Sequence, residues 1–268
     1  MNKLFVVLAI LFGTLGVHAA SICDDPMGYT AVCNKMKNLR SHIMMIESQR
    51  DLMLLNYGYV ANVSSSLSVT AAELVNELPL DLENHRPALQ KIATKANEVS
   101  QLALAKDPQV FVTANNLRQN CASCHTTSDP SSGVKWDEVF KMDWSKIVQK
   151  CDMPGRNPFI CKNMYAMVTN HGYISTAYMN KIENYSMINV VANEFDRISS
   201  LLIDNNFLHD RMANIQEVRE RAKEVAVLAE KKDASALQKA NEITSSCAGC
   251  HSFSVQTSPV KTNFQIWN

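Results

Sequence analysis

The chain has 268 residues and carries 26 basic and 26 acidic side chains, so its formal charge at pH 7 is zero. This balance excludes the strongly basic surface that recruits nucleic acid or anionic membranes. Hydrophobic residues make up 46% of the chain and charged residues 19%, which is the composition of a globular protein and not of a disordered one.

Residues 1–20 have the pattern of a secretory signal peptide. Lys3 supplies the positive start, residues 4–17 are mostly apolar, and Ala19 and Ala20 offer small-residue cleavage sites. An uncleaved membrane anchor is the alternative, but the apolar run is short for a spanning helix. We therefore expect a periplasmic protein with no membrane span after cleavage, whose eight cysteines all enter an oxidising compartment.

After the signal, the sequence predicts four helices in order. Apolar side chains at steps of three and four mark the first, and the fourth begins at Asp107, a capping residue, followed by Pro108, which suits a first helical turn. The expected ranges are 32–54, 61–78, 87–105 and 107–125. Because the links are short and no stretch alternates like a strand, these helices predict a four-helix bundle.

The same pattern occurs twice along the chain. Residues 95–125 align without a gap with residues 221–251, at an offset of 126. The front of the unit, around Cys23, aligns with the residues around Cys151 at an offset of 128. We therefore predict an all-α protein of two tandem four-helix bundles, residues 21–145 and 146–268, each with Cys-x-x-Cys-His at the end of its fourth helix.

Each predicted fourth helix carries the attachment motif of c-type haem. Two thiols three positions apart can each bond a vinyl group of the porphyrin, and the adjacent histidine can ligate the iron. A thioredoxin-like redox pair opens a helix instead of closing one, and two Cys and one His make an incomplete zinc site. We therefore expect two covalently bound haem c groups, with the following residues as anchors and ligands: Cys121, Cys124 and His125 for one, Cys247, Cys250 and His251 for the other.

An exported helical bundle with this motif on its fourth helix resembles cytochrome c prime and its low-spin relatives. The resemblance covers each unit once, and it implies that the first helix faces the far side of the haem. High-spin members leave the sixth iron site open, whereas low-spin members place a methionine there. Met36 and Met164 are the repeat-matched candidates, although a methionine filling space in the core would give the same pattern. His171 shares the face of Met164 and is a rival for the second haem.

The other four cysteines open the two units. Cys23 and Cys33 are separated like Cys151 and Cys161, and four cysteines allow three pairings. The duplication favours local bridges, because each unit must have folded alone before the two were fused. We expect the disulfides Cys23–Cys33 and Cys151–Cys161, each stabilising its unit by roughly 2–3 kcal/mol. Free thiols are the alternative, which export disfavours.

These features predict a periplasmic one-electron transfer protein and not an enzyme. The sequence holds no nucleophile elbow, phosphate loop or second metal motif, so the chemistry would be that of the iron. Gas binding at a five-coordinate haem is the first alternative, and a dihaem peroxidase is the second. We expect redox proteins as partners, and the chain as a monomer or a homodimer.

Overall fold

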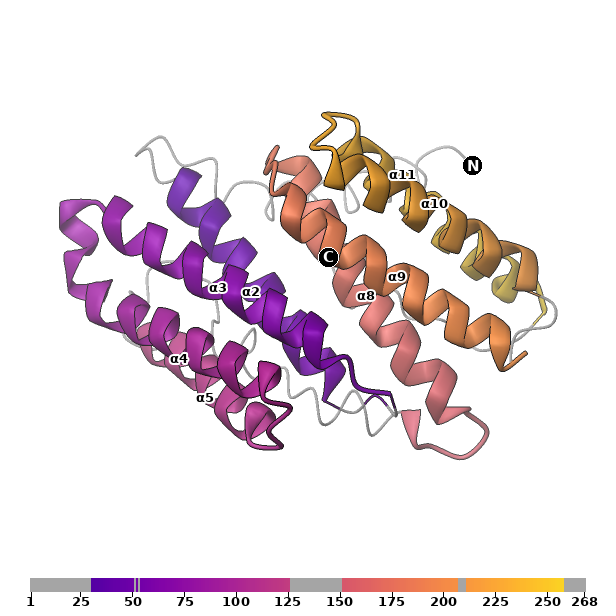
Figure 1. The fold of residues 1–268 in the computed structure, drawn as a ribbon, viewed down its shortest axis with the longest axis horizontal. Coiled ribbons are helices and arrows are strands. Elements are labelled where there is room, and N and C mark those ends of the chain that lie inside the picture. Colours follow the sequence, from indigo (N-terminus) through magenta and orange to yellow (C-terminus); the bar gives the residue numbers. More distant parts are fainter. Residues whose placement is uncertain (1–29, 51, 53, 126–150, 207–210, 258–268) are drawn as a thin grey trace, which may run out of the picture.

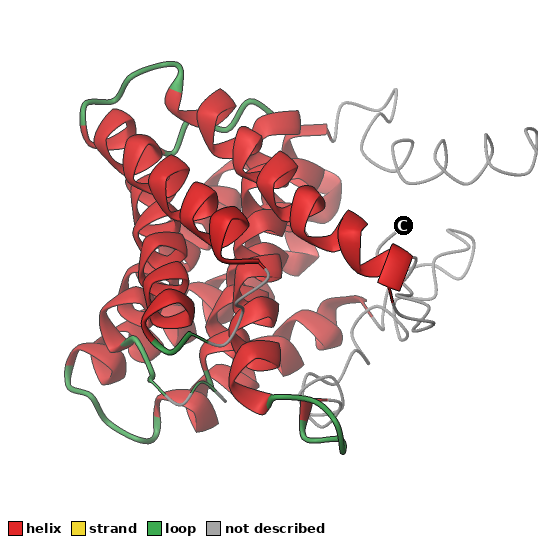
Figure 2. Ribbon diagram, turned by 90° about the vertical axis from the view of Figure 1, so that its right-hand side faces the viewer, coloured by secondary structure: helices red, strands yellow, loops and turns green. Residues whose placement is uncertain are grey.

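The computed structural model describes residues 30–50, 52, 54–125, 151–206 and 211–257. Every regular element within these ranges is helical, so the predicted all-α class is confirmed (Figure 2). The expected signal peptide and the residues that join the two predicted units lie outside the described ranges. Within those ranges, no helix combines the length and the apolar character that crossing a membrane requires.

The first half of the described chain contains four α-helices and a short 3-10 helix, η1 (Leu80–His85). The α-helices are α2 (Thr30–Gln49), α3 (Tyr57–Glu77), α4 (Arg86–Leu104) and α5 (Val110–His125). The predicted first helix is too long at its end, because the chain turns after Gln49, where the amide of Leu52 donates to the Gln49 carbonyl at 3.2 Å. Asn56 then starts α3 by accepting from the amide of Tyr59 at 3.0 Å.

The second half repeats this order. Its helices are α8 (Pro158–Met179), α9 (Tyr185–Asp204), α10 (Met212–Glu230) and α11 (Ala236–Thr257). The first two begin 128 positions after α2 and α3, and the last two begin 126 positions after α4 and α5. The helix starts thus follow the two offsets of the sequence alignment. The two-residue difference falls between α3 and α4, where the first half contains η1.

The connections before α5 and α11 are also alike. Lys106 and Lys232 both have a φ of 54°, a left-handed conformation that lets the next amide reach back to the preceding helix. The amide of Asp107 donates to the Leu102 carbonyl at 2.9 Å, and the amide of Asp233 donates to Leu228 at 2.9 Å. The aspartate carboxylates then accept from amides two residues on, so α5 and α11 each begin one residue later still.

The two halves meet along α2 and α8, which lie side by side at the centre of the molecule (Figure 1). α3 also contacts α9, while α4 and α10 pack on the outer sides of α3 and α9. One hydrophobic core runs through both halves. Its largest fully buried apolar side chains come from helices of each half: Met45, Ile46, Leu67, Leu74, Leu89, Leu117, Tyr173, Ile174, Met187, Ile188, Phe195 and Ile198.

Candidate functional site

The first Cys-x-x-Cys-His cluster lies in the last turns of α5. The backbone is helical from Cys121 to His125, so positions 121 and 124 share one face of the helix. Cys121 is partly buried and packs against the hydrophobic core. The side chains of Cys124 and His125 lie outside the described part of the structure.

The second cluster lies within α11 and does not close it. The helix continues past His251 to Thr257, so the predicted position at the end of the helix is wrong for this copy. The first proline after the cluster is Pro259, so no proline prevents a helical backbone over residues 252–257. Cys247 is partly buried against the core, like Cys121. The side chains of Cys250 and His251 are not among those described.

An ion pair shows which face of α2 is turned towards the first cluster. Arg118 lies seven positions before His125 and therefore on the same face of α5. Its Nη1 is 3.9 Å from Oε1 of Glu47, a buried residue of α2. Glu47 in turn shares its helix face with Met36, because residues 36, 40, 43 and 47 are spaced by four, three and four. The Met36 face of α2 thus lies opposite the cluster face of α5.

The position of Met36 along α2 also agrees with its expected place. Met36 precedes Glu47 by a stretch of helix about 16 Å long, and His125 follows Arg118 by about 10 Å. Because α2 and α5 run antiparallel, both residues lie towards the same end of the helix pair. Met36 is partly buried against the core, and so is Met164 in α8, which contacts α11. Both methionines therefore remain candidates for an axial ligand or for core packing.

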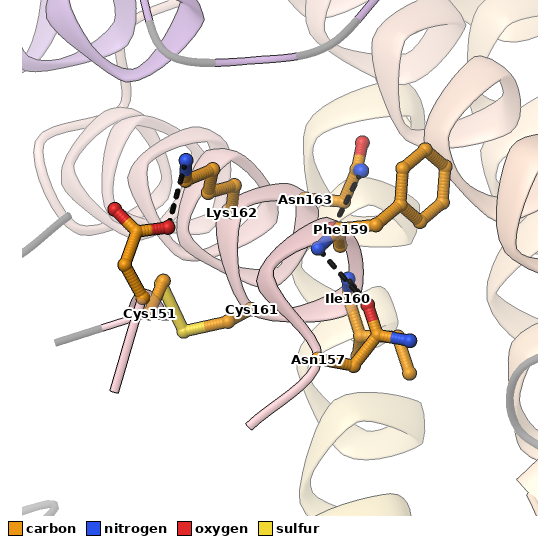
Figure 3. Close-up of a disulfide and its surroundings, with 8 residues drawn as sticks. Cys151, Asn157, Phe159, Ile160, Cys161, Lys162 and Asn163 are labelled. Carbon is orange, nitrogen blue, oxygen red and sulfur yellow. Dashed lines mark hydrogen bonds and ion pairs between the residues drawn. A yellow bond between two sulfur atoms is a disulfide. The ribbon is translucent and has the colours of Figure 1, made fainter. Parts of the chain in front are cut away.

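The turn before α8 is closed by a disulfide. Cys151 and Cys161 are joined, as the duplication predicted for this pair (Figure 3). Cys33 is also disulfide-bonded, while Cys23 lies outside the described residues. Asn157 begins α8 by accepting from the amides of Phe159 and Ile160 at 3.0 and 3.2 Å. The disulfide therefore joins the start of the second half to the first turn of α8.

His42 is a buried histidine that the sequence did not single out. Its Nδ1 is 2.7 Å from the carbonyl oxygen of Asn38, which can only accept, so Nδ1 carries the proton. Its Nε2 therefore accepts from the hydroxyl of Ser66 at 3.0 Å. Burial lowers the pKa of His42 to about 4, and its ring meets Tyr173 of the other half edge-on at 5.3 Å. Both nitrogens are thus engaged, and the residue is a neutral part of the interface.

His171, which the sequence offered as a rival to Met164, lies on α8 one turn after Met167. Its Nε2 is 3.2 Å from the hydroxyl of Ser175 on the next turn of the same helix. Burial lowers the pKa of His171, which favours its neutral form. The hydrogen bond with Ser175 engages one ring nitrogen within α8.

A buried carboxylate ties the two halves together. Glu194 of α9 has a fully buried side chain, and it accepts from Gln49 Nε2 at 2.9 Å and from Asn56 Nδ2 at 2.8 Å. Arg197 pairs with the same carboxylate through Nη2 at 2.6 Å and through Nε at 2.8 Å. The Tyr59 hydroxyl also donates to Asn170 Oδ1 across the interface. From the sequence alone, these polar residues would be assigned to the surface. Their role in the interface becomes visible only when the two halves are packed together.

Comparisons of the chain with protein-family models, with curated proteins and with solved structures found no match. Within the described ranges, no three His, Cys, Asp or Glu side chains gather as a metal site.

Proposed function

We propose that the chain is a periplasmic dihaem cytochrome c that transfers single electrons. In this account α2–α5 and α8–α11 are two copies of one four-helix bundle, and each copy holds one covalent haem. The observation that carries the proposal is the recurrence of Cys-x-x-Cys-His at the same position of a helical backbone in both halves. The Cys151–Cys161 disulfide supports export, because disulfides persist in oxidising compartments.

The residues of the first half fit a covalently held haem. The helical backbone puts positions 121 and 124 on one face, where two thioether bonds could form, and His125 follows at once as the axial ligand. The Arg118–Glu47 pair indicates that the Met36 face of α2 is opposite this face. When bound, the haem iron would supply the one-electron change, while the chain would supply ligands, burial and spacing.

Met36 and Met164 are proposed as the sixth ligands. Each stands on the helix that borders its cluster helix, and each is partly buried, so neither is an ordinary surface residue. A thioether ligand raises the reduction potential of a haem relative to a second imidazole, which suits a relay in an oxidising compartment. If both methionines only fill space, the irons would be five-coordinate, and gas binding would be the function instead.

The proposal is tested by producing the protein in a host that attaches haem c covalently. Denatured protein should give the absorption of two haem c per chain, and a redox titration should consume two electrons per chain. No covalent haem would overturn the proposal.

The ligands are tested with Met36→Leu and Met164→Leu, which keep an apolar side chain of similar size. Met45→Leu is the matched control, because Met45 is a fully buried methionine of α2 outside the Met36 face. Each ligand variant should lose the methionine-to-iron absorption band of one haem and gain carbon monoxide binding at it, whereas Met45→Leu should change neither. Carbon monoxide binding by the unmodified reduced protein would favour gas binding.

A further inference from the structure

The central helices α2 and α8 run antiparallel, as two side-chain contacts show. The Thr169 hydroxyl donates to the Ser48 hydroxyl at 3.2 Å, and the rings of His42 and Tyr173 meet at 5.3 Å. From the first contact to the second, the residue number falls along α2 and rises along α8. The two helices, which lie side by side in Figure 1, therefore point in opposite directions, and their starts lie at opposite ends of the pair.

The two methionine candidates lie on opposite sides of the centre of this helix pair. The two contacts put residue 44 of α2 level with about residue 172 of α8, and the repeat offset of 128 matches these two positions. Met36 precedes residue 44 by the same number of residues as Met164 precedes residue 172, which is about 12 Å of helix in each case. Because the helices are antiparallel, Met36 and Met164 are about 24 Å apart along the pair.

The two clusters are separated in the same sense. The ion pair between Arg118 and Glu47 puts Arg118 slightly beyond the centre of α2, on the side away from Met36. His125 follows Arg118 by about 10 Å towards Met36, so the first cluster ends about 6 Å from the centre on the Met36 side. α11 contacts α8 as α5 contacts α2, which puts the second cluster on the Met164 side. The proposed haems would therefore lie about 12–24 Å apart along the pair, on opposite sides of its centre.

Two aromatic rings fill the interface at this centre. His42 and Tyr173 are both 0% exposed, and their rings are in edge-on contact between the halves. Nδ1 of His42 also donates to the carbonyl of Asn38, which follows Met36 closely on α2. A series of bonded and packed groups thus leads from the Met36 side of α2 into α8. Electrons tunnel faster through such groups than across a gap, because the electronic coupling decays less steeply.

We propose that electrons pass between the two haems across the α2–α8 contact, with His42 and Tyr173 as the bridge. The inference rests on the proposed haem-binding function. In each transfer one iron is oxidised as the other is reduced, and the two rings couple the irons without being oxidised themselves. Because the clusters lie towards opposite ends of the pair, an electron would enter at one end of the molecule and leave at the other. Each end would then serve a different redox partner.

Pulsed electron paramagnetic resonance of the oxidised holoprotein tests the placement of the two irons. The spectrum should show only the weak dipolar coupling of two centres that are more than about 12 Å apart. Strong magnetic exchange between the irons, which haems in direct contact would show, would overturn the inference.

Pulse radiolysis tests the bridge, because it adds one electron per chain and absorbance then follows the exchange between the haems. The measurements use a Cys247→Ser parent, in which the second haem keeps one vinyl group and therefore absorbs at a different wavelength from the first. Tyr173→Leu removes the ring and leaves a gap, so it should slow the exchange several-fold and leave both potentials unchanged. Tyr173→Phe keeps the ring and should exchange at the rate of the parent.

Two further variants keep the test decisive. His42→Asn puts the matched residue of the second half at this position, and it should slow the exchange even if Tyr173→Leu does not fold. Ser48→Ala is the matched control, because it breaks the other contact between α2 and α8 and leaves both rings in place. An unchanged rate in Tyr173→Leu and His42→Asn, or an equal loss in Ser48→Ala, would overturn the inference. Absence of covalent haem from the parent would refute the proposed function instead.

Discussion

Replacing Glu194 with Ala should destabilise the protein strongly, because this carboxylate joins the two halves. Its side chain is fully buried, and four donor groups point to it, from Gln49, Asn56 and both Nε and Nη2 of Arg197. A hydrogen bond to a charged group contributes about 1.5–3 kcal/mol, and such contributions do not add fully. Breaking a buried pair costs about 3–5 kcal/mol in total. We therefore expect Glu194→Ala to lower the free energy of unfolding by about 4 kcal/mol.

Glu194→Gln separates charge from shape. The glutamine amide keeps one oxygen that can accept from Asn56 or Gln49, but its NH₂ group would face donors in place of the second carboxylate oxygen. We therefore expect Glu194→Gln to lower the free energy of unfolding by about half as much as Glu194→Ala. Glu224→Ala is the matched control, because the Glu224 side chain is 54% exposed and its Oε1 is 3.9 Å from Nζ of Lys239. An exposed pair of this kind contributes less than about 1 kcal/mol.

The assay is urea unfolding followed by far-ultraviolet circular dichroism. Glu194→Ala should lower the midpoint, and it should broaden the transition or split it in two, since the halves then unfold with less coupling. A midpoint equal to that of Glu224→Ala, with an unchanged slope, would refute the argument that Glu194 holds the interface.

Three further predictions test other parts of the fold. In the folded protein His42 stays neutral until the pH falls to about 4, whereas in the unfolded chain it binds a proton below about pH 6.5. Acidification between these values should therefore lower the free energy of unfolding of the parent by up to roughly 3 kcal/mol more than that of His42→Asn. Unfolding at a series of pH values measures this difference. Tyr173→Phe should be neutral or stabilising, because the buried Tyr173 hydroxyl has no hydrogen-bond partner among the described residues. Tyr59→Phe loses the hydrogen bond to Asn170 and should lower the free energy of unfolding by about 1 kcal/mol. Equal thermal midpoints for the two variants would contradict this expectation. Lys106→Gly should stabilise by about 1 kcal/mol, because glycine adopts the left-handed φ of 54° without steric cost, and an unchanged midpoint would count against it.

The helices and their order could be predicted because local signals determine them. Apolar spacing marks each buried face, and Asp107 and Asp233 mark the turns that start the last helix of each half. The repeat itself predicted the Cys151–Cys161 pairing, since a unit that folds alone needs local bridges.

The interface between the halves could not be predicted, because its residues carry no local signal. His42 and Gln49 are polar residues of α2. Their partners in the other half, Tyr173 of α8 and Glu194 of α9, follow more than a hundred residues later in the chain. The matched residue of His42 is Asn170, so the duplication gave no warning of a buried histidine.

The central claim is that each Cys-x-x-Cys-His cluster binds one haem covalently, and intact-protein mass spectrometry tests it most directly. The mature chain should carry two haem c groups. The Cys121→Ser/Cys124→Ser and Cys247→Ser/Cys250→Ser variants should carry one each, and the fourfold variant none. A parent chain without added haem, or haem that persists in the fourfold variant, would contradict the account.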